Sequence, residues 1–255
     1  SVNPSISSWF IKISLGFFLL SSAGPFALGF IMANGFGQSN WYYFAVYYYL
    51  HFQYNGFFLF GIFGLFFKML EERHVVIKRP EALRVGYVMA IATLPAYLLS
   101  VLWANPGWIF NFIGFFAAGL QIIALILFSW ILWRDRNGLK EIFSPFAVIL
   151  LRIVLISLYI KVVLQLLSTF PQIASLAYEI RAFVIAYLHL VLLGIISLFL
   201  LFWYAEKGFI NANKVIPALR LFIGGLTGME VLLIASPCWT ITTGFAPIVL
   251  QTGIF

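Results

Sequence analysis

The chain is poor in charge. Only 9% of its 255 residues are charged, whereas charged residues make up about a quarter of a soluble domain. Hydrophobic residues make up 63%, 29 residues are Phe, and the mean hydropathy is +1.03. This composition leaves too little polar surface to face water, so it excludes a soluble globular domain.

Cysteine and the common catalytic motifs are also scarce. Cys238 is the only cysteine, so no internal disulfide can form. The sequence has no Cys/His cluster with zinc spacing and no glycine-rich phosphate loop before a helix. The last long apolar run, 215–236, has no lysine at its middle. The nearest lysine, Lys214, lies at its inner end. A retinal Schiff base of the rhodopsin kind is therefore excluded.

Long apolar runs dominate instead. A helix needs about 20 apolar residues to cross the hydrocarbon core. The runs that qualify are 9–33, 41–68, 83–103, 107–133, 145–169, 180–204 and 215–236. The tail 237–255 is apolar but interrupted by Pro and Gly, as a partial further element would be. We expect an all-α integral membrane bundle of about seven transmembrane helices, forming a single domain over residues 1–255.

Local signals set some boundaries. Ser144 followed by Pro145 predicts a helix N-cap with proline at the first helical position. Pro25 and Pro95 fall inside apolar runs and predict kinks. The opening Ser1-Val2-Asn3-Pro4 is not an initiator sequence, so we expect a processed chain or the C-terminal part of a longer one.

The net charge of +7 does not indicate nucleic-acid binding, because the basic residues lie in short loops between apolar runs. One set of alternate loops holds them: Lys68, Arg73, Lys78, Arg79 and Arg84, then Arg134, Arg136 and Lys140, then Lys207 and Lys214. The opposite loops, 33–41 and 103–107, have none, and the connection near 180 has only Arg181. This bias predicts a cytoplasmic N-terminus and an external C-terminus.

An internal repeat carries two of the three histidines. Residues 49–56 read YLHFQYNG and residues 187–194 read YLHLVLLG, so both follow the pattern Tyr-Leu-His-x-x-x-x-Gly. The remaining histidine, His74, lies in a charged loop and is expected at the surface.

The two repeated histidines are expected at matched depth. His51 and His189 lie on helices predicted to run in the same direction, each about 13–15 Å from the outer helix end at 1.5 Å per residue. A planar cofactor held between them would use both imidazoles as metal ligands, with Asn55 and Tyr48 near the first. Two alternatives stay open: interhelical hydrogen bonding by each histidine, and a proton or ion pathway.

Other polar groups at membrane depth are candidate functional residues. Arg152 and Lys161 are expected to extend towards the inner and outer interfaces, with pairing of Lys161 to a haem propionate or to Glu230 as the alternative. Glu230 is the only acid well inside a predicted span. Arg181 is expected at the outer interface, with propionate contact as its alternative role. The last intramembrane polar residue in this set is Gln53.

Three stretches resemble a family of bacterial membrane proteins typical of Bacteroidetes. They are residues 21–29 (SSAGPFALG), 48–58 (YYLHFQYNGFF) and 187–194 (YLHLVLLG). That family is distantly similar to haem-copper oxidase subunit I and to nitric-oxide-response membrane proteins. The resemblance implies ligand histidines on helices spaced four apart, near the outer side of a bacterial inner membrane, which positions 51 and 189 fit.

The chain departs from the oxidase pattern at several points. The paired histidine expected on the helix after His51 is absent, and the expected His-x-His near position 189 is reduced to His189-Leu190-Val191. Family members usually carry a preceding helical half with another histidine, which this sequence lacks. Oxygen reduction by this chain alone is therefore not expected.

Three hypotheses follow. The first is a haem- or metal-binding membrane protein, with haem b held by His51 and His189, that transfers electrons to a partner in the membrane or senses a diatomic gas. The second is a structural or assembly subunit of a larger membrane complex. The third is a transporter that uses Glu230, Lys161 and the histidines as a proton or ion path.

Overall fold

The computed structural model describes residues 5–210 and 212–243, with the backbone alone at 212–213 and 236–243. Every regular element in these ranges is helical. In chain order they are α1 (Ile6–Ser21), α2 (Ala23–Ala33), α3 (Asn40–His51), η1 (Phe52–Phe58), α4 (Leu59–Glu72), α5 (Arg79–Thr93), η2 (Pro95–Ser100), η3 (Leu102–Ala104), α6 (Trp108–Arg134), α7 (Arg136–Ile142), α8 (Pro145–Leu167), α9 (Pro171–Glu179), α10 (Arg181–His189), η4 (Leu190–Ser197), α11 (Leu198–Glu206) and α12 (Ala212–Thr243).

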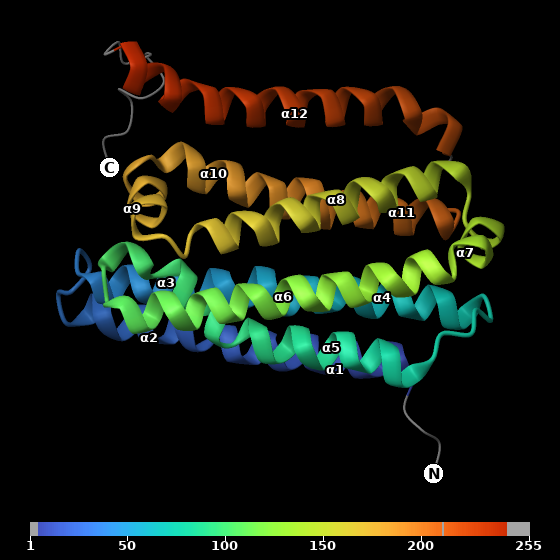
Figure 1. Ribbon diagram of the computed structural model, residues 1–255, viewed down its shortest axis with the longest axis horizontal. Coiled ribbons are helices and arrows are strands. Elements are labelled where there is room, and N and C mark those ends of the chain that lie inside the picture. The colour runs from blue at the N-terminus through green and yellow to red at the C-terminus, as the bar shows by residue number, and fades with distance from the viewer. Residues whose placement is uncertain (1–4, 211, 244–255) are drawn as a thin grey trace.

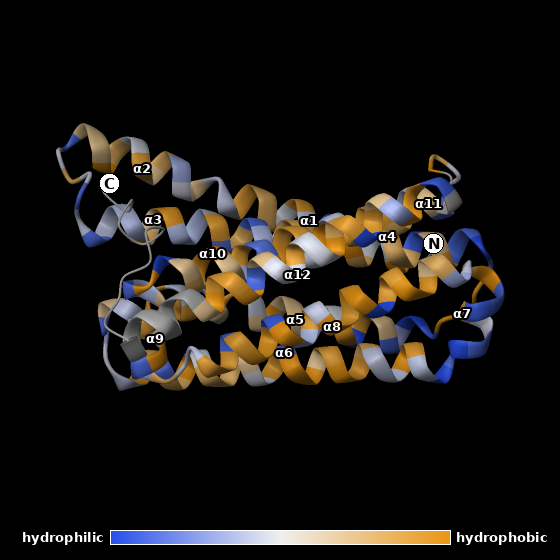
Figure 2. Ribbon diagram, turned by 90° about the horizontal axis from the view of Figure 1, so that it is seen from above, coloured by the Kyte–Doolittle hydropathy of each residue, from blue (hydrophilic) through white to orange (hydrophobic). Residues whose placement is uncertain are grey.

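Six continuous helical stretches are long and apolar enough to cross a membrane. They are Ile6–Ala33, Asn40–Glu72, Trp108–Arg134, Pro145–Leu167, Arg181–Glu206 and Lys214–Ala235. In Figure 1 the long helices run side by side, and Figure 2 shows hydrophobic residues along the middle of the bundle, with hydrophilic residues gathered towards its ends. These are the features of a multi-pass membrane protein, as the composition predicts.

The predicted run 83–103 is absent from these six because its helix is interrupted at Pro95. Proline has no backbone N–H and cannot continue the α-helical hydrogen bonding. The α-helix α5 ends at Thr93 after 15 residues, and the chain continues as the 3₁₀ segments η2 and η3. The other intrahelical proline, Pro25, lies just after the break at Ser22 that separates α1 from α2. The regular α-helix is thus interrupted close to both prolines at which the sequence predicts kinks.

The predicted N-cap is confirmed as well. The Ser144 side chain accepts a hydrogen bond from the Ala147 amide at 3.2 Å, and Pro145 is the first residue of α8.

The packing repeats along the chain. α1 packs against α4 and η1, and α8 packs against η4 and α11 in the same way. α5 then contacts η1, as α12 contacts η4. α6 lies between the two groups, in contact with both α5 and α8. The fold therefore contains two similar three-helix units, which we call the first and second repeats, joined by α6. The first comprises α1 with α2, α3 with η1 and α4, and α5. The second comprises α8, α10 with η4 and α11, and α12.

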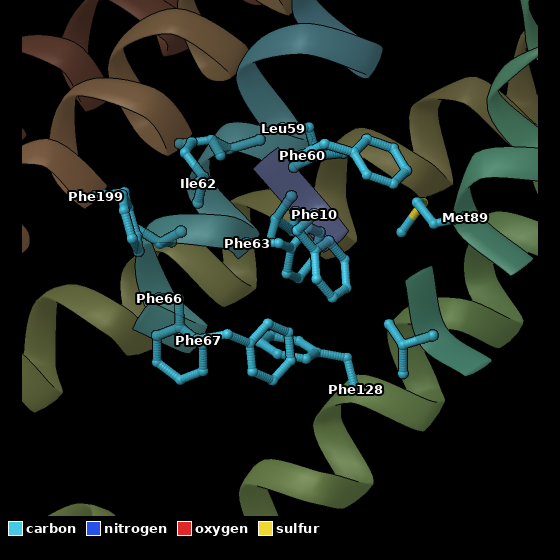
Figure 3. Packing of buried hydrophobic residues seen from close by; sticks show 14 of the residues in the cluster. Phe10, Leu59, Phe60, Ile62, Phe63, Phe66, Phe67, Met89, Phe128 and Phe199 are labelled. Carbon is cyan, nitrogen blue, oxygen red and sulfur yellow. The ribbon is translucent and has the colours of Figure 1, made fainter. Parts of the chain in front are cut away.

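Aromatic residues fill the core of the first repeat. Phe10 of α1 is fully buried, and its ring stacks on that of Phe67 with centroids 5.0 Å apart. Phe63 contacts the Phe128 ring of α6 edge to face, at 4.9 Å. Figure 3 shows these rings together with Met89 of α5. Side chains of α1, α4, α5 and α6 therefore meet in one hydrophobic cluster.

Ion pairs join the loops at the end of the bundle that carries α7. Arg73 pairs with Glu206 at 2.7 Å, donates to the Ile142 carbonyl, and lies over the Phe143 ring at 4.9 Å. One guanidinium thus links the ends of three spans. His74 follows it at the exposed surface, as predicted.

The repeated glycines lie at close contacts with the preceding span. A Cβ at Gly56 would lie 2.5 Å from Cβ of Phe17 on α1, whereas one at Gly194 would lie 3.2 Å from Oγ of Ser157 on α8. Gly16, on α1, has nothing within 4 Å. We expect Gly56→Ala to lower the free energy of unfolding by about 1–3 kcal/mol, because it overpacks this contact.

Thermal unfolding in detergent measures this effect. Gly194→Ala should unfold closer to the unmodified protein than Gly56→Ala does, and Gly16→Ala, the matched control, should not destabilise. Equal melting temperatures for Gly56→Ala and Gly16→Ala would contradict the close packing of α1 on η1.

Candidate functional site

A cavity lies between the two repeats. Its volume is about 690 Å³, and its walls come from α3 and η1 on one side and from α8, α10, η4 and α12 on the other, with α9, η2 and η3 at one end. Most lining residues are apolar. The polar side chains that line it include Tyr47, His51, Asn55, Ser157, Gln165 and Glu230.

Two aromatic rings stack across one end of this cavity. Trp103 of η3 and Tyr178 of α9 both line it, and their rings are nearly parallel with centroids 4.1 Å apart. This stack joins the first repeat to the second, because α9 leads directly into α10.

The wall of the cavity is also open at the side. Ile156, Ile160 and Leu164 of α8 and Ile234 of α12 line the cavity and are themselves 40–58% exposed. In a membrane protein, exposed apolar side chains at this depth face lipid. In the part of the chain that the structure describes, the cavity is therefore open between α8 and α12.

His51 is buried at the inner wall and is held by two hydrogen-bonding contacts. Its Nε2 lies 2.9 Å from the carbonyl of Thr93, and its Nδ1 lies 3.3 Å from Nδ2 of Asn55. A carbonyl only accepts, so Nε2 carries the proton and Nδ1 accepts from the amide. The ring therefore satisfies a carbonyl at the end of α5, just before Pro95 ends the α-helical hydrogen bonding.

Both histidines end an α-helix and begin a π-helical segment, η1 after His51 and η4 after His189. A π-helical segment inserts an extra residue into a helix and is frequent at functional sites. Hydroxyl groups bond carbonyls within both segments: Ser14 donates to the Phe57 carbonyl at 2.7 Å, and Ser197 to the Leu192 carbonyl at 2.9 Å. The repeated sequence frame thus corresponds to a repeated backbone irregularity.

His189 contacts a different helix. Its Nδ1 lies 3.4 Å from Oε1 of Glu230 on α12, and the two side chains are partly exposed. Both atoms are buried, and neither has a hydrogen-bond partner among the described residues, so the contact is a close approach of two polar groups. Each histidine therefore contacts the third helix of its own repeat, His51 through a backbone carbonyl and His189 through a carboxylate.

The geometry does not present both imidazoles to one planar cofactor. His51 lines the cavity, but His189 is not among its lining residues, and the ring nitrogens of His51 are already engaged. Among the side chains that the structure describes, no group of three or more His, Cys, Asp or Glu residues could hold a metal ion. Haem or metal ligation by His51 and His189 stays a prediction that this geometry does not support.

Lys161 lies beside the cavity rather than at the outer interface. Its side chain is 1% exposed, and Nζ donates to Oε1 of Gln165 at 2.8 Å and to Oε1 of Gln121 at 3.3 Å. The expectation that it extends to the outer interface is therefore wrong. The described ion pairs do not join it to Glu230 either.

Of the remaining predicted residues, four lie away from the cavity wall and two line it. Tyr48 packs edge to face on Phe52 at 4.7 Å, and Gln53 donates to the Ser21 hydroxyl at 3.0 Å, so both contribute to packing within the first repeat. Arg152 and Arg181 are exposed, as expected of residues at or near an interface. Asn55 and Glu230 do line the cavity.

Ser157 and Gln165 were missed from the sequence. Together with the predicted Lys161 they recur at four-residue spacing on α8, so a polar stripe faces inward along an otherwise apolar helix. That spacing was a usable signal. The carbonyl of Thr93 and the Trp103–Tyr178 stack had none, because each depends on contacts between distant parts of the chain.

The comparisons with known proteins add nothing to this geometry. No family model, no curated protein and no solved structure matches the chain.

The contact between His51 and Thr93 gives a testable stability effect. Removing a donor from a buried carbonyl costs about 1–3 kcal/mol. We expect His51→Asn to lower the free energy of unfolding by this amount, because the shorter side chain no longer reaches α5. The matched substitution His74→Asn, at an exposed loop position with φ of 57°, should have little effect.

Thermal or denaturant unfolding in detergent measures both variants. If His51→Asn and His74→Asn prove equally stable, the hydrogen bond across the α3–α5 interface does not support the fold.

Proposed function

We propose that this protein is a membrane carrier that takes an amphipathic molecule from the bilayer into the cavity between its two repeats. The observation that carries the proposal is the cavity itself: about 690 Å³, mostly apolar, with polar side chains at its inner wall and a side open between α8 and α12. A ligand with an apolar body and a polar head matches this distribution.

The repeated architecture supports a carrier in particular. Transporters often consist of internal repeats, with the substrate bound at the repeat interface and helices that are discontinuous at membrane depth. Here the helix at each repeated histidine changes from α to π geometry, and η1 contacts η4 beside the cavity. Glu230, which lines the cavity and contacts His189, provides a group that can exchange a proton with the carried molecule.

The topology forms part of the proposal. Counting α5 with η2 and η3 as a crossing gives seven crossings, with α7 and the basic loops on the cytoplasmic side of a bacterial inner membrane. Both repeats then have the same orientation, because one crossing, α6, separates them. This arrangement places α9 and the Trp103–Tyr178 stack at the outer end of the cavity.

Photo-crosslinking tests occupancy of the cavity. The probes are two molecules with the same diazirine-bearing C16 chain, one a fatty acid and the other the corresponding alcohol. We expect at least one probe to label Leu198, which lines the cavity and is 1% exposed, in addition to lipid-facing residues such as Phe26.

A cavity-filling pair of variants controls the assignment. Val184→Trp places bulk in the wall of the cavity, whereas Ile123→Trp places the same bulk on an exposed face of α6 outside it. Labelling at Leu198 should fall severalfold in the first variant and persist in the second. Labelling confined to lipid-facing residues with both probes would overturn the proposal.

A second candidate function rests on His51. It is the one histidine of the described chain that lines the cavity, and its N–H donates to a backbone carbonyl, which is the usual outer contact of a ligating imidazole. The fit is incomplete, since Asn55 occupies the side of Nδ1. Haem at this position would supply electron transfer or gas binding, as the sequence resemblance implies.

An oxidised-minus-reduced spectrum tests the haem candidate. We expect a Soret band near one haem per chain if haem is bound, lost in His51→Ala and retained in His189→Ala. A band lost in both variants would favour ligation by the two histidines together. A colourless protein from haem-replete cells would contradict the haem candidate, and the carrier proposal would then be the one that remains.

A further inference from the structure

Lys161 is a buried basic side chain whose contacts, among the described residues, include no charged group. Its ammonium group has three donors, and the described contacts use two of them on neutral amide oxygens. Burial of a cation is costly unless an anion is close. In the described part of the chain, none of the ion pairs includes Lys161.

One partner of this lysine belongs to the cavity wall. Gln165 accepts its shortest hydrogen bond and lines the cavity, and Ser157, one turn from Lys161 on the same face of α8, lines the cavity as well. The Gln165 side chain therefore connects Lys161 to the cavity wall. The amide of Gln121 is 1% exposed and its Nε2 has no partner in the described structure, so the cluster has an unused donor too.

The other polar groups on the wall do not supply a free negative charge. Glu230 is the one carboxylate among the lining residues, and its described contact is to His189. Asn55 offers a buried Oδ1 without a partner, which is an acceptor and not an anion. One donor of Lys161 and the Nε2 donor of Gln121 therefore have no described acceptor, and the carboxylate of a bound molecule would provide acceptors for them.

We infer that the molecule bound in this cavity carries a carboxylate, which Lys161 recognises through its ammonium group in place of Gln165, while the hydrocarbon body lies along the apolar wall towards α12. The inference rests on the proposed function, because it assigns the head group of the molecule that the cavity holds. The ligand class is a lipophilic carboxylic acid, such as a long-chain fatty acid.

The two diazirine probes distinguish the head groups. A hydrogen bond to a charged partner contributes about 1.5–3 kcal/mol, which corresponds to roughly tenfold or more in occupancy. We expect the fatty acid to label Leu198 about ten times more efficiently than the alcohol at equal concentration. Both probes should label the lipid-facing Phe26 equally, which corrects for partition into detergent or bilayer.

Two substitutions assign the preference to Lys161. Lys161→Met removes the ammonium group and keeps an unbranched side chain, and Gln165→Glu supplies a carboxylate from the protein while preserving shape. Each should reduce the acid preference at Leu198 to about onefold. Lys161→Arg keeps the charge and should keep a preference for the acid. Melting temperatures show which variants are folded, and Gln165→Glu remains decisive if Lys161→Met does not fold.

The outcomes separate the inference from the proposed function. Equal labelling of Leu198 by acid and alcohol overturns the carboxylate assignment and leaves the cavity proposal intact. An acid preference that persists in folded Lys161→Met or Gln165→Glu overturns the role of Lys161. The absence of labelling at Leu198 by either probe overturns both.

Discussion

The hydrogen bond between His51 Nε2 and the Thr93 carbonyl shows the constraint that governs this fold. Inside hydrocarbon no water satisfies a free backbone group, so every break in a helix must be repaired by the protein itself. Pro95 ends α5, and a side chain from the second span supplies the donor at 2.9 Å. Ser14 and Ser197 do the same for carbonyls in the two π-helical segments. These side-chain hydrogen bonds stabilise the irregular helical segments by satisfying their backbone carbonyls.

These repairs also give the cavity its polar wall. His51 and Asn55 lie where α3 becomes η1, so the groups that stabilise the break also line the space between the repeats. Gly56 lets α1 approach η1 closely behind that wall. The second repeat has the same order of contacts, but its histidine meets a carboxylate and not a carbonyl. The two repeats thus share a backbone plan and differ in the group that the repeated histidine contacts.

Composition and run length were enough to predict an all-helical membrane bundle, because the hydrocarbon core imposes one length on every span. The N-cap at Ser144 and the breaks near Pro25 and Pro95 also followed from local rules. The repeat of Tyr-Leu-His-x-x-x-x-Gly was visible, but the inference that its histidines meet was not supported. Equal depth on two helices does not fix the direction of either side chain. His51 contacts α5 and His189 contacts α12, each the third helix of its own repeat. Lys161 was predicted as a candidate residue, but its side chain was expected at the outer interface and is buried instead. Its partner Gln121 lies 40 residues away on another helix, so the sequence did not indicate this contact.

The central claim is that the space between the repeats holds a ligand drawn from the membrane. Native mass spectrometry of the protein released from its own membrane tests this most directly, with Val184→Trp and Ile123→Trp as a matched pair. The account predicts one small amphipathic molecule bound per chain in the unmodified protein and in Ile123→Trp, and its loss from Val184→Trp. Folded protein without any bound molecule, or equal retention in both variants, would contradict it.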